Sequence, residues 1–286
     1  DYGCTNHPGF DISCPSVAQD VCSPTQPALS DPSTCHISPN NPWNESIPLY
    51  SNDTIIEQPV DLTTLSDRYA HEAIRFMHQA TLRRQPFFVY MAWNHMHVPI
   101  GNHEPQFANT SADRGVYGDT LRQLDSSIGR VVEALDREAA AENTLILLLG
   151  DNGGPSDQCN YGGINSPFDG NWLKSTHGGG GTGKQSTWEG GHREPGIATW
   201  PGKIDAGTRS SATLSALDVM PTFLALAGVE LPPNRIFDGV DISKVLLENA
   251  ASVHRPIGNG ALFHPNSGGE GVIGELETLR LREFKL

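Results

Sequence analysis

Residues 145–154 read LILLLGDNGG, and this stretch decides the fold. Five aliphatic residues in a row are typical of a strand that is covered on both faces, and a glycine turn carrying Asp151 and Asn152 follows at once. The stretch therefore predicts a buried β-strand that ends in a polar turn.

A second apolar run of strand length, PFFVYMAW, occupies residues 86–93. Apolar residues recur at helical spacing from 61 to 84 and again from 117 to 141, so each apolar run follows a predicted helix. The order helix, strand, helix, strand predicts an α/β fold with a mainly parallel sheet flanked by helices. In such sheets the chemistry lies beyond the carboxyl ends of the strands, here residues 94–99 and 150–154.

Weaker signals continue the pattern toward the C-terminus. Residues 197–200 predict a short strand, and residues 276–281 predict another. Between them, Asp218 predicts a helix N-cap, with Pro221 in the first turn and Gly228 as the C-terminal stop.

The charge balance narrows the classes of partner. The chain has 286 residues, and 33 acidic against 19 basic residues give a formal net charge of -14 at pH 7. A surface this acidic repels nucleic-acid phosphates and anionic lipids, so we expect no nucleic-acid partner. We also expect no membrane span, because no apolar run approaches the roughly 18 residues that one requires.

The first 35 residues contain four of the five cysteines among turn-forming residues, without hydrophobic periodicity. We expect two local disulfides, in any of three pairings, among Cys4, Cys14, Cys22 and Cys35. Cys159 is either a buried free thiol or half of a bridge to a partner outside this chain. Sequons for N-glycosylation at Asn44, Asn52 and Asn109 agree with the cysteines in favouring the secretory pathway.

Asp151 and Asn152 offer a carboxylate and an amide oxygen, which are ligands that calcium and magnesium accept. The alternative is that these residues only form a turn. His95 and His97 follow the other apolar run, and strand alternation predicts that both point to the same side. Such histidines bind anions or protonate leaving groups, whereas a zinc site is disfavoured because no nearby Cys or Glu completes a ligand set.

Residues 178–184, GGGGTGK, imitate a phosphate-binding loop. Gln185 stands where such loops carry the Ser or Thr that holds magnesium, and no apolar strand leads into the loop. What remains is Lys184 presented by glycines, which allow close approach of an anionic substrate.

The ordered motifs resemble the sulfatase family within the alkaline-phosphatase-like superfamily, and most closely its arylsulfatase A and G branch. The resemblance rests on the cysteine-rich opening and on segments 47–50, 57–60, 87–90, 95–99, 117–119, 124–129, 143–144, 150–153, 183–195, 200–202, 217–222, 237–241 and 263–268. It implies hydrolysis of a sulfate ester around bound calcium, with magnesium less favoured, by a formylglycine made from a cysteine.

By the same resemblance, Asp151 and Asn152 are calcium ligands, His97 lies by the leaving group, Lys184 contacts the sulfate, and His95 is a supporting residue. The expected substrate is a sulfated small molecule or a sulfated sugar. A formylglycine-generating enzyme is the expected partner of the parent protein. The parent is expected to be lysosomal or extracellular, and its assembly into a homo-oligomer is left open.

Two family motifs, a paired-Asp calcium motif and Cys-x-Pro-x-Arg, are not found in the sequence. Cys22 begins a near miss that has Gln26 in place of the arginine. We therefore expect an internal fragment, inactive alone, with the nucleophile outside it. Expected parts are a cysteine-rich segment (1–60), the C-terminal portion of the catalytic α/β domain (61–255) and the start of a small α+β domain (256–286). The alternatives left open are a phosphoester or phosphonate hydrolase and a non-catalytic relative that binds carbohydrate or protein.

Overall fold

The computed structural model describes residues 48–97, 100–154, 163–168, 183–184, 186–253, 261–265, 276–281 and 284–286. The chain divides into two compact units, one from residues 1–140 and 155–164 and the other from residues 141–154 and 165–286. The five cysteines and Asn44, for which we expect disulfides and glycosylation, lie outside the described residues.

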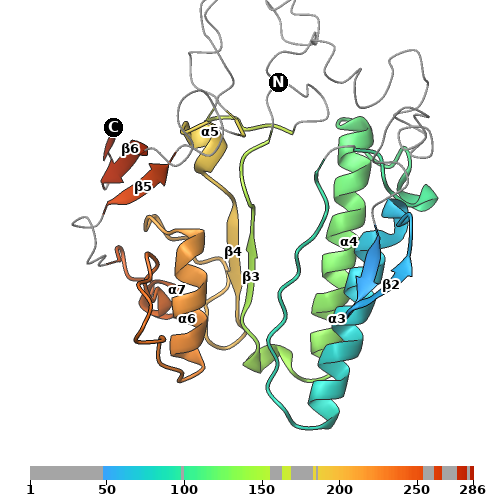
Figure 1. The fold of residues 1–286 in the computed structure, drawn as a ribbon, viewed down its shortest axis with the longest axis horizontal. Coiled ribbons are helices and arrows are strands. Elements are labelled where there is room, and N and C mark those ends of the chain that lie inside the picture. The colour runs from blue at the N-terminus through green and yellow to red at the C-terminus, as the bar shows by residue number, and fades with distance from the viewer. Residues whose placement is uncertain are drawn as a thin grey trace, which may run out of the picture. The chain divides into compact units, whose positions relative to one another are not determined.

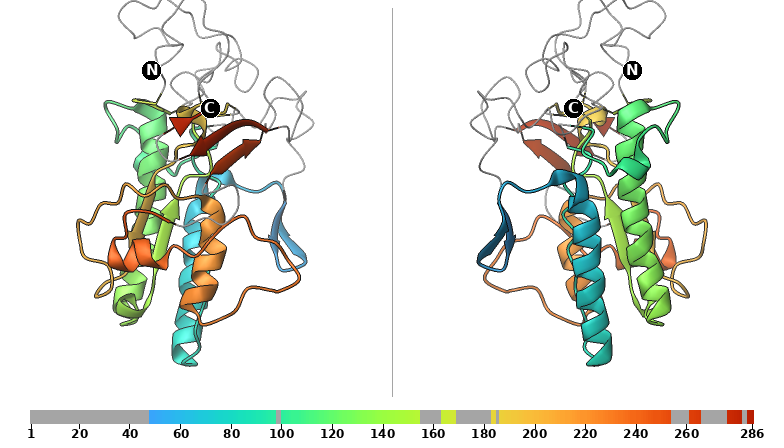
Figure 2. Two further views of the ribbon diagram at one scale, coloured as in Figure 1. Left: turned by 90° about the vertical axis from the view of Figure 1, so that its left-hand side faces the viewer. Right: turned by 90° about the vertical axis from the view of Figure 1, so that its right-hand side faces the viewer.

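The first unit is built on two long helices, α3 (Leu65–Leu82) and α4 (Gly115–Arg137), with short 3-10 turns at Leu62–Thr64 and Pro105–Phe107. Figures 1 and 2 show the two helices side by side along their length. Both helices were predicted from apolar periodicity, and both predictions are confirmed. Their buried side chains are mostly small, including Ala70, Ala73, Ala80 and Ala134, which allows the helices to pack closely.

Buried polar side chains connect the two helices to the chain around them. Gln123 of α4 is fully buried, and it donates to the Thr63 carbonyl at 2.8 Å and accepts from the Glu104 N–H at 2.9 Å. The Ser127 hydroxyl donates to Asp67 of α3 at 2.7 Å. Since these groups are removed from water, their hydrogen bonds fix the register of the helix pair.

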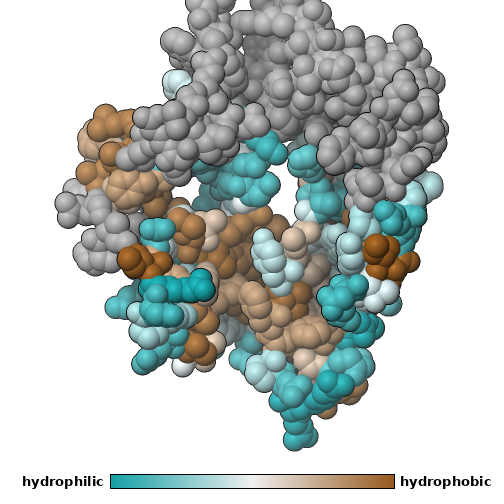
Figure 3. Space-filling view, viewed as in Figure 1, coloured by the Kyte–Doolittle hydropathy of each residue, from teal (hydrophilic) through white to brown (hydrophobic). Residues whose placement is uncertain are grey.

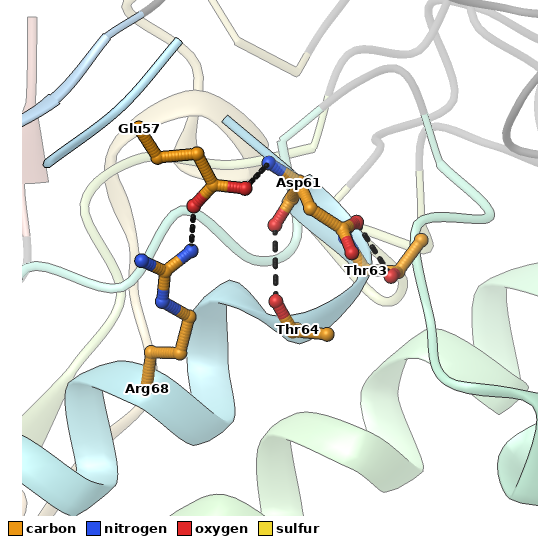
Figure 4. A network of polar contacts seen from close by, with 5 residues as sticks. All are labelled: Glu57, Asp61, Thr63, Thr64 and Arg68. Atoms are coloured by element: carbon orange, nitrogen blue, oxygen red, sulfur yellow. Dashed lines mark hydrogen bonds and ion pairs between the residues drawn. The ribbon is translucent and has the colours of Figure 1, made fainter. Parts of the chain in front are cut away.

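A short hairpin of β1 (Leu49–Ser51) and β2 (Thr54–Glu57) precedes α3. Figure 4 shows how it is attached: the Glu57 carboxylate accepts from Arg68 of α3 and from the Asp61 N–H, while Asp61 caps the first turn. Ile55 and Ile56 are exposed and form a small apolar patch over β2 (Figure 3). The sequon residues Asn52 and Asn109 are exposed as well.

Residues 86–93 differ from the prediction of a strand covered on both faces. No strand is assigned to them, and exposure alternates along the run, with Phe88 67% and Tyr90 82% exposed. The prediction of full burial is wrong here, because within the described residues no strand pairs with this run.

In the second unit, β3 (Ile146–Leu149) pairs antiparallel with β4 (Gly196–Thr199), with Ile146 opposite Thr199. Both strands were predicted. All strand pairings in the described parts of the chain are antiparallel, so the expected parallel pairing is not among them. Leu148 and Leu149 are 37% and 41% exposed, and the expectation that β3 is covered on both faces is therefore wrong.

The helices of the second unit are short: α5 (Glu189–His192), α6 (Val219–Leu226) and α7 (Ser243–Glu248), with 3-10 turns at Ala141–Asn143 and Ala216–Asp218. Gly228 follows α6 with φ +71°, as expected of a C-terminal stop. Asp218 precedes α6 but does not cap it. Its fully buried carboxylate instead accepts from the N–H groups of Ser215 and Val240. These two hydrogen bonds join the turn before α6 to a loop that is distant in sequence.

A three-stranded antiparallel sheet of β5 (Leu262–Pro265), β6 (Leu276–Leu281) and β7 (Phe284–Lys285) completes the second unit. The predicted strand at 276–281 is confirmed. Apolar side chains of this sheet, including Phe263 and Phe284, are exposed, and Figure 3 shows the apolar surface over β5 and β6. None of the helices in the described ranges is both long and apolar enough to cross a bilayer.

Candidate functional site

The turn after β3 carries the predicted metal ligands, Asp151 and Asn152. The Asn152 N–H donates to the Asp151 carboxylate at 2.8 Å, and the Asn152 amide donates to the Gly153 carbonyl at 3.0 Å. The Asp151 side chain is exposed and that of Asn152 is half-buried. The turn therefore fixes both residues through the backbone and leaves the second carboxylate oxygen and the amide oxygen available as ligands.

Close backbone packing between this turn and α5 explains its glycines. The Gly153 N–H donates to the Gly191 carbonyl at 3.1 Å, and a Cβ on Gly153 would overlap the Gly190 carbonyl oxygen. A Cβ on Gly191 would likewise collide with the carbonyl of Ser186. The turn and the short helix can approach this closely only without side chains at these positions.

Lys184 is attached to the same turn. Its backbone N–H donates to the Gly154 carbonyl at 3.1 Å, and Asn165 brackets Gly154 by accepting from its N–H at 2.9 Å and donating to its carbonyl at 2.8 Å. The structure thus brings the backbone of Lys184 to the turn that carries Asp151 and Asn152. The sequence reasoning did not identify Asn165, whose Asn-Ser-Pro context is that of an ordinary turn.

Glu194 is a second acidic group at the turn that the sequence reasoning missed. Its carboxylate lies against Gly150, where a Cβ would overlap one of its oxygens, and its Oε1 is buried without a hydrogen-bond partner among the described residues. Burial, with the nearby Asp151 charge, raises the pKa of Glu194 to about 7. Two carboxylates held together at a turn repel each other, and a cation at Asp151 would relieve that repulsion.

The donor set therefore fits a hard divalent cation, with Asp151 and Asn152 as two oxygen ligands. No group of three or more His, Cys, Asp or Glu side chains that could hold a metal occurs within the ranges that the structure describes.

The histidines lie in the first unit and differ in environment. His95 is half-buried, its Nδ1 is 3.1 Å from the Asn94 amide oxygen, and burial followed by the nearby His103 lowers its pKa. The His97 side chain is exposed, and the backbone N–H of His97 donates to the Asn94 carbonyl at 3.1 Å. Residues 95–96 form a turn, so the strand alternation from which we predicted a common direction for the two side chains does not apply.

Comparison with known proteins places these motifs in a family. The family model described as Sulfatase matches residues 22–229. The chain is 42% identical over 289 residues to arylsulfatase G of Rattus norvegicus, with all of this chain and 51% of the relative aligned. It is 37% identical over 224 residues to N-acetylgalactosamine-6-sulfatase of Canis lupus familiaris, with 74% of this chain and 40% of that relative aligned. The chain thus spans about half the length of the curated relatives it matches most fully.

A solved structure supports the fold assignment. The PsFucS1 sulfatase from Pseudoalteromonas sp. superimposes with a TM-score of 0.65 at 28% identity, covering 80% of this chain and 43% of that one. The α/β, alkaline-phosphatase-like fold expected from the motifs is thereby confirmed, as is the resemblance to the arylsulfatases. From its residues, its fold and these relatives, the chain belongs to the sulfatase family.

Proposed function

We propose that the protein carrying this chain hydrolyses sulfate esters in a calcium-dependent reaction. The observation that carries the proposal is the Asp151–Gly154 turn, where two hard oxygen ligands and the backbone of Lys184 are joined in a chain of the sulfatase family. The resemblance assigns the nucleophile, a formylglycine made by a formylglycine-generating enzyme, to sequence outside this chain.

Asp151 and Asn152 are the residues of this chain that would hold calcium. When bound, calcium supplies positive charge to the oxygens of the sulfate group. Calcium suits the site better than magnesium, since it accepts a mixed set of carboxylate and amide oxygens in flexible geometry.

Lys184 contacts the sulfate in this proposal and neutralises charge that grows on its oxygens in the transition state. His97 donates a proton to the oxygen of the leaving alcohol, a role that imidazole side chains commonly take in catalysis. His95, held by Asn94, supports the loop that carries His97.

The proposed substrate is a sulfated small molecule or a sulfated sugar. Support comes from the relative named N-acetylgalactosamine-6-sulfatase, whose name specifies a sulfated sugar. We further propose a secretory location, lysosomal or extracellular, for which the exposed sequon residues Asn52 and Asn109 and the cysteine-rich opening are the support.

The test uses the intact natural protein that carries these 286 residues. Turnover of 4-nitrophenyl sulfate should exceed that of 4-nitrophenyl phosphate, and a calcium chelator should abolish it. Lys184→Ala should lower kcat by about 100-fold or more, the effect of removing one charge-stabilising donor. Lys203→Ala, at an exposed lysine, is the matched control and should keep full activity. A Lys184→Ala variant as active as the wild type would remove Lys184 from the site.

A further inference from the structure

One carbonyl oxygen at the Asp151–Gly154 turn is shared by two other segments of the chain. The Gly154 carbonyl accepts from the Lys184 backbone N–H at 3.1 Å and from the Asn165 side-chain amide at 2.8 Å. A carbonyl oxygen has two lone pairs, so these two hydrogen bonds use its full capacity. Asn165 and Lys184 are therefore coupled through a single atom.

The side chain of Asn165 also accepts from the N–H of Gly154, at 2.9 Å. Its amide thus pairs with both backbone groups of one residue, as a neighbouring strand would. Because the amide oxygen only accepts and the amide nitrogen only donates, this reciprocal pair fixes the orientation of the side chain. An aspartate at this position could make only the first of the two hydrogen bonds at neutral pH, and an alanine could make neither.

Asn165 is itself held by the short segment that it begins. The Phe168 N–H donates to the Asn165 carbonyl at 2.9 Å, and the guanidinium of Arg193 lies over the Phe168 ring, 4.5 Å from its centroid. A cation over an aromatic face is attracted to it. Arg193 directly follows α5, so residues 165–168 contact the turn at one end and the end of α5 at the other.

The short helix α5 is in turn fixed from two sides. The Gly191 carbonyl accepts from the Gly153 N–H of the turn at 3.1 Å. The Glu189 carboxylate forms ion pairs with Arg280 of β6 at 2.7 Å and with Lys285 of β7 at 3.0 Å. The turn, residues 165–168 and α5 thus form a closed ring of contacts within the second unit.

The two proposed calcium ligands have anchors of their own. The Asn152 N–H donates to the Asp151 carboxylate, and the Asn152 amide donates to the Gly153 carbonyl. The backbone of Lys184, in contrast, is joined to the turn at the Gly154 carbonyl that Asn165 also holds. Loss of the Asn165 side chain should therefore displace Lys184 and leave the two ligands in place.

We propose that Asn165 is a positioning residue, which fixes Gly154 and thereby determines where Lys184 lies relative to Asp151 and Asn152. This inference rests on the proposed function, in which Lys184 contacts the sulfate. A displaced charge stabilises the transition state less well, and a shift of about 1 Å can cost roughly 100-fold in rate. Asn165 contributes to turnover through Lys184.

The test is a double-mutant cycle in the intact natural protein, with 4-nitrophenyl sulfate as the substrate. Asn165→Ala should lower kcat by at least about tenfold, because Lys184 is displaced. In a Lys184→Ala background the same substitution should lower kcat by less than about twofold, because no charge is left to position. Asn234→Ala, at an exposed asparagine of the same unit, is the control and should keep kcat.

Two measurements that need no turnover accompany the cycle. Calorimetric titration should give Asn165→Ala the calcium affinity of the wild type. The backbone amide hydrogen of Lys184 should exchange faster in Asn165→Ala, as mass spectrometry of a peptide that contains Lys184 measures. If Asn165→Ala fails to fold by circular dichroism, Asn165→Asp makes the same kinetic test.

Equal losses of kcat in the two backgrounds, or a fall in calcium affinity, would overturn the proposal, since either result means that Asn165 does not act through Lys184. An unchanged kcat in Asn165→Ala would overturn it as well. A wild type that does not hydrolyse 4-nitrophenyl sulfate counts against the proposed function instead. Amide exchange at Lys184 then decides whether Asn165 fixes its backbone.

Discussion

The helix pair of the first unit and the α5 region of the second differ in whether their buried polar groups have hydrogen-bond partners. Between α3 and α4, Gln123 and Ser127 are buried with their hydrogen bonds made. Around α5, Glu194 and His264 each bury an atom that has no partner among the described residues. Among the described residues of α3 and α4, Ser66 is the exception, because its buried hydroxyl has no hydrogen-bond partner there.

The difference separates residues that stabilise the fold from residues that are available to a ligand. A buried polar group without a partner costs free energy, and such groups are retained where binding supplies the partner. The unpartnered Glu194 oxygen beside the Asp151–Gly154 turn thus agrees with a binding site there, and the paired groups of the helix pair agree with a structural role.

Glycine variants give the largest expected effect that distinguishes the two regions. Gly153→Ala places a Cβ on the Gly190 carbonyl oxygen, so the turn must shift, and displacement of about 1 Å can cost roughly 100-fold in activity. Gly129→Ala in α4, where a Cβ meets no atom within 4 Å, should keep activity and add about 0.5–1 kcal/mol of stability. Steady-state kinetics and urea unfolding measure both; equal activity in the two variants would contradict the role of the turn.

Replacing the buried amide of Gln123 should lower stability and leave activity unchanged, the opposite of the effect expected for Gly153→Ala. Gln123→Ala leaves the Thr63 carbonyl and the Glu104 N–H without partners, and we expect a loss of about 1–3 kcal/mol in the free energy of unfolding. Activity per folded molecule should not change. Gln106→Ala, at an exposed glutamine, is the control. A fall in kcat without a fall in stability would mean that the helix pair has a catalytic role.

Replacing Glu194 and replacing Glu189 should change the pH dependence of stability in opposite directions. These are the smallest effects that we expect. The pKa of Glu194 is about 7 in the folded state, against an ordinary value of 4.5 in the unfolded chain. The folded state is therefore destabilised as pH rises from 4.5 to 7, because ionisation is easier in the unfolded chain. Glu194→Gln should therefore be more stable than the wild type at pH 8, by about 1 kcal/mol, with the difference vanishing near pH 4. The measurement is urea unfolding in calcium-free buffer.

Glu189 is the matched case, because its pKa is lowered to about 2. Its ion pairs stabilise the fold above pH 4.5, and this stability is lost as pH falls toward 2. Glu189→Gln should accordingly be less stable than the wild type at pH 8. If both variants shift stability in the same direction, the environments described for the two carboxylates are wrong.

The sequence predicted helices and strands where a local pattern carries the information. Apolar periodicity predicted α3 and α4, and an aliphatic run predicted β3 and the polar turn that follows it. The burial of residues 86–93 was predicted wrongly, because composition shows that a strand can be covered but not which strand covers it. Glu194 and Asn165 were missed because their contacts with the turn join segments that do not adjoin in sequence.

Calcium binding tests the central claim, that the Asp151–Gly154 turn holds the cation of a sulfatase site. Calorimetric titration of the intact natural protein with calcium should give a single site, and Asp151→Asn should weaken its affinity by at least about tenfold, since a carboxylate ligand is lost. Asp205→Asn, at an exposed aspartate of the same unit, should bind as the wild type does. Equal calcium affinity in Asp151→Asn and the wild type would contradict the account.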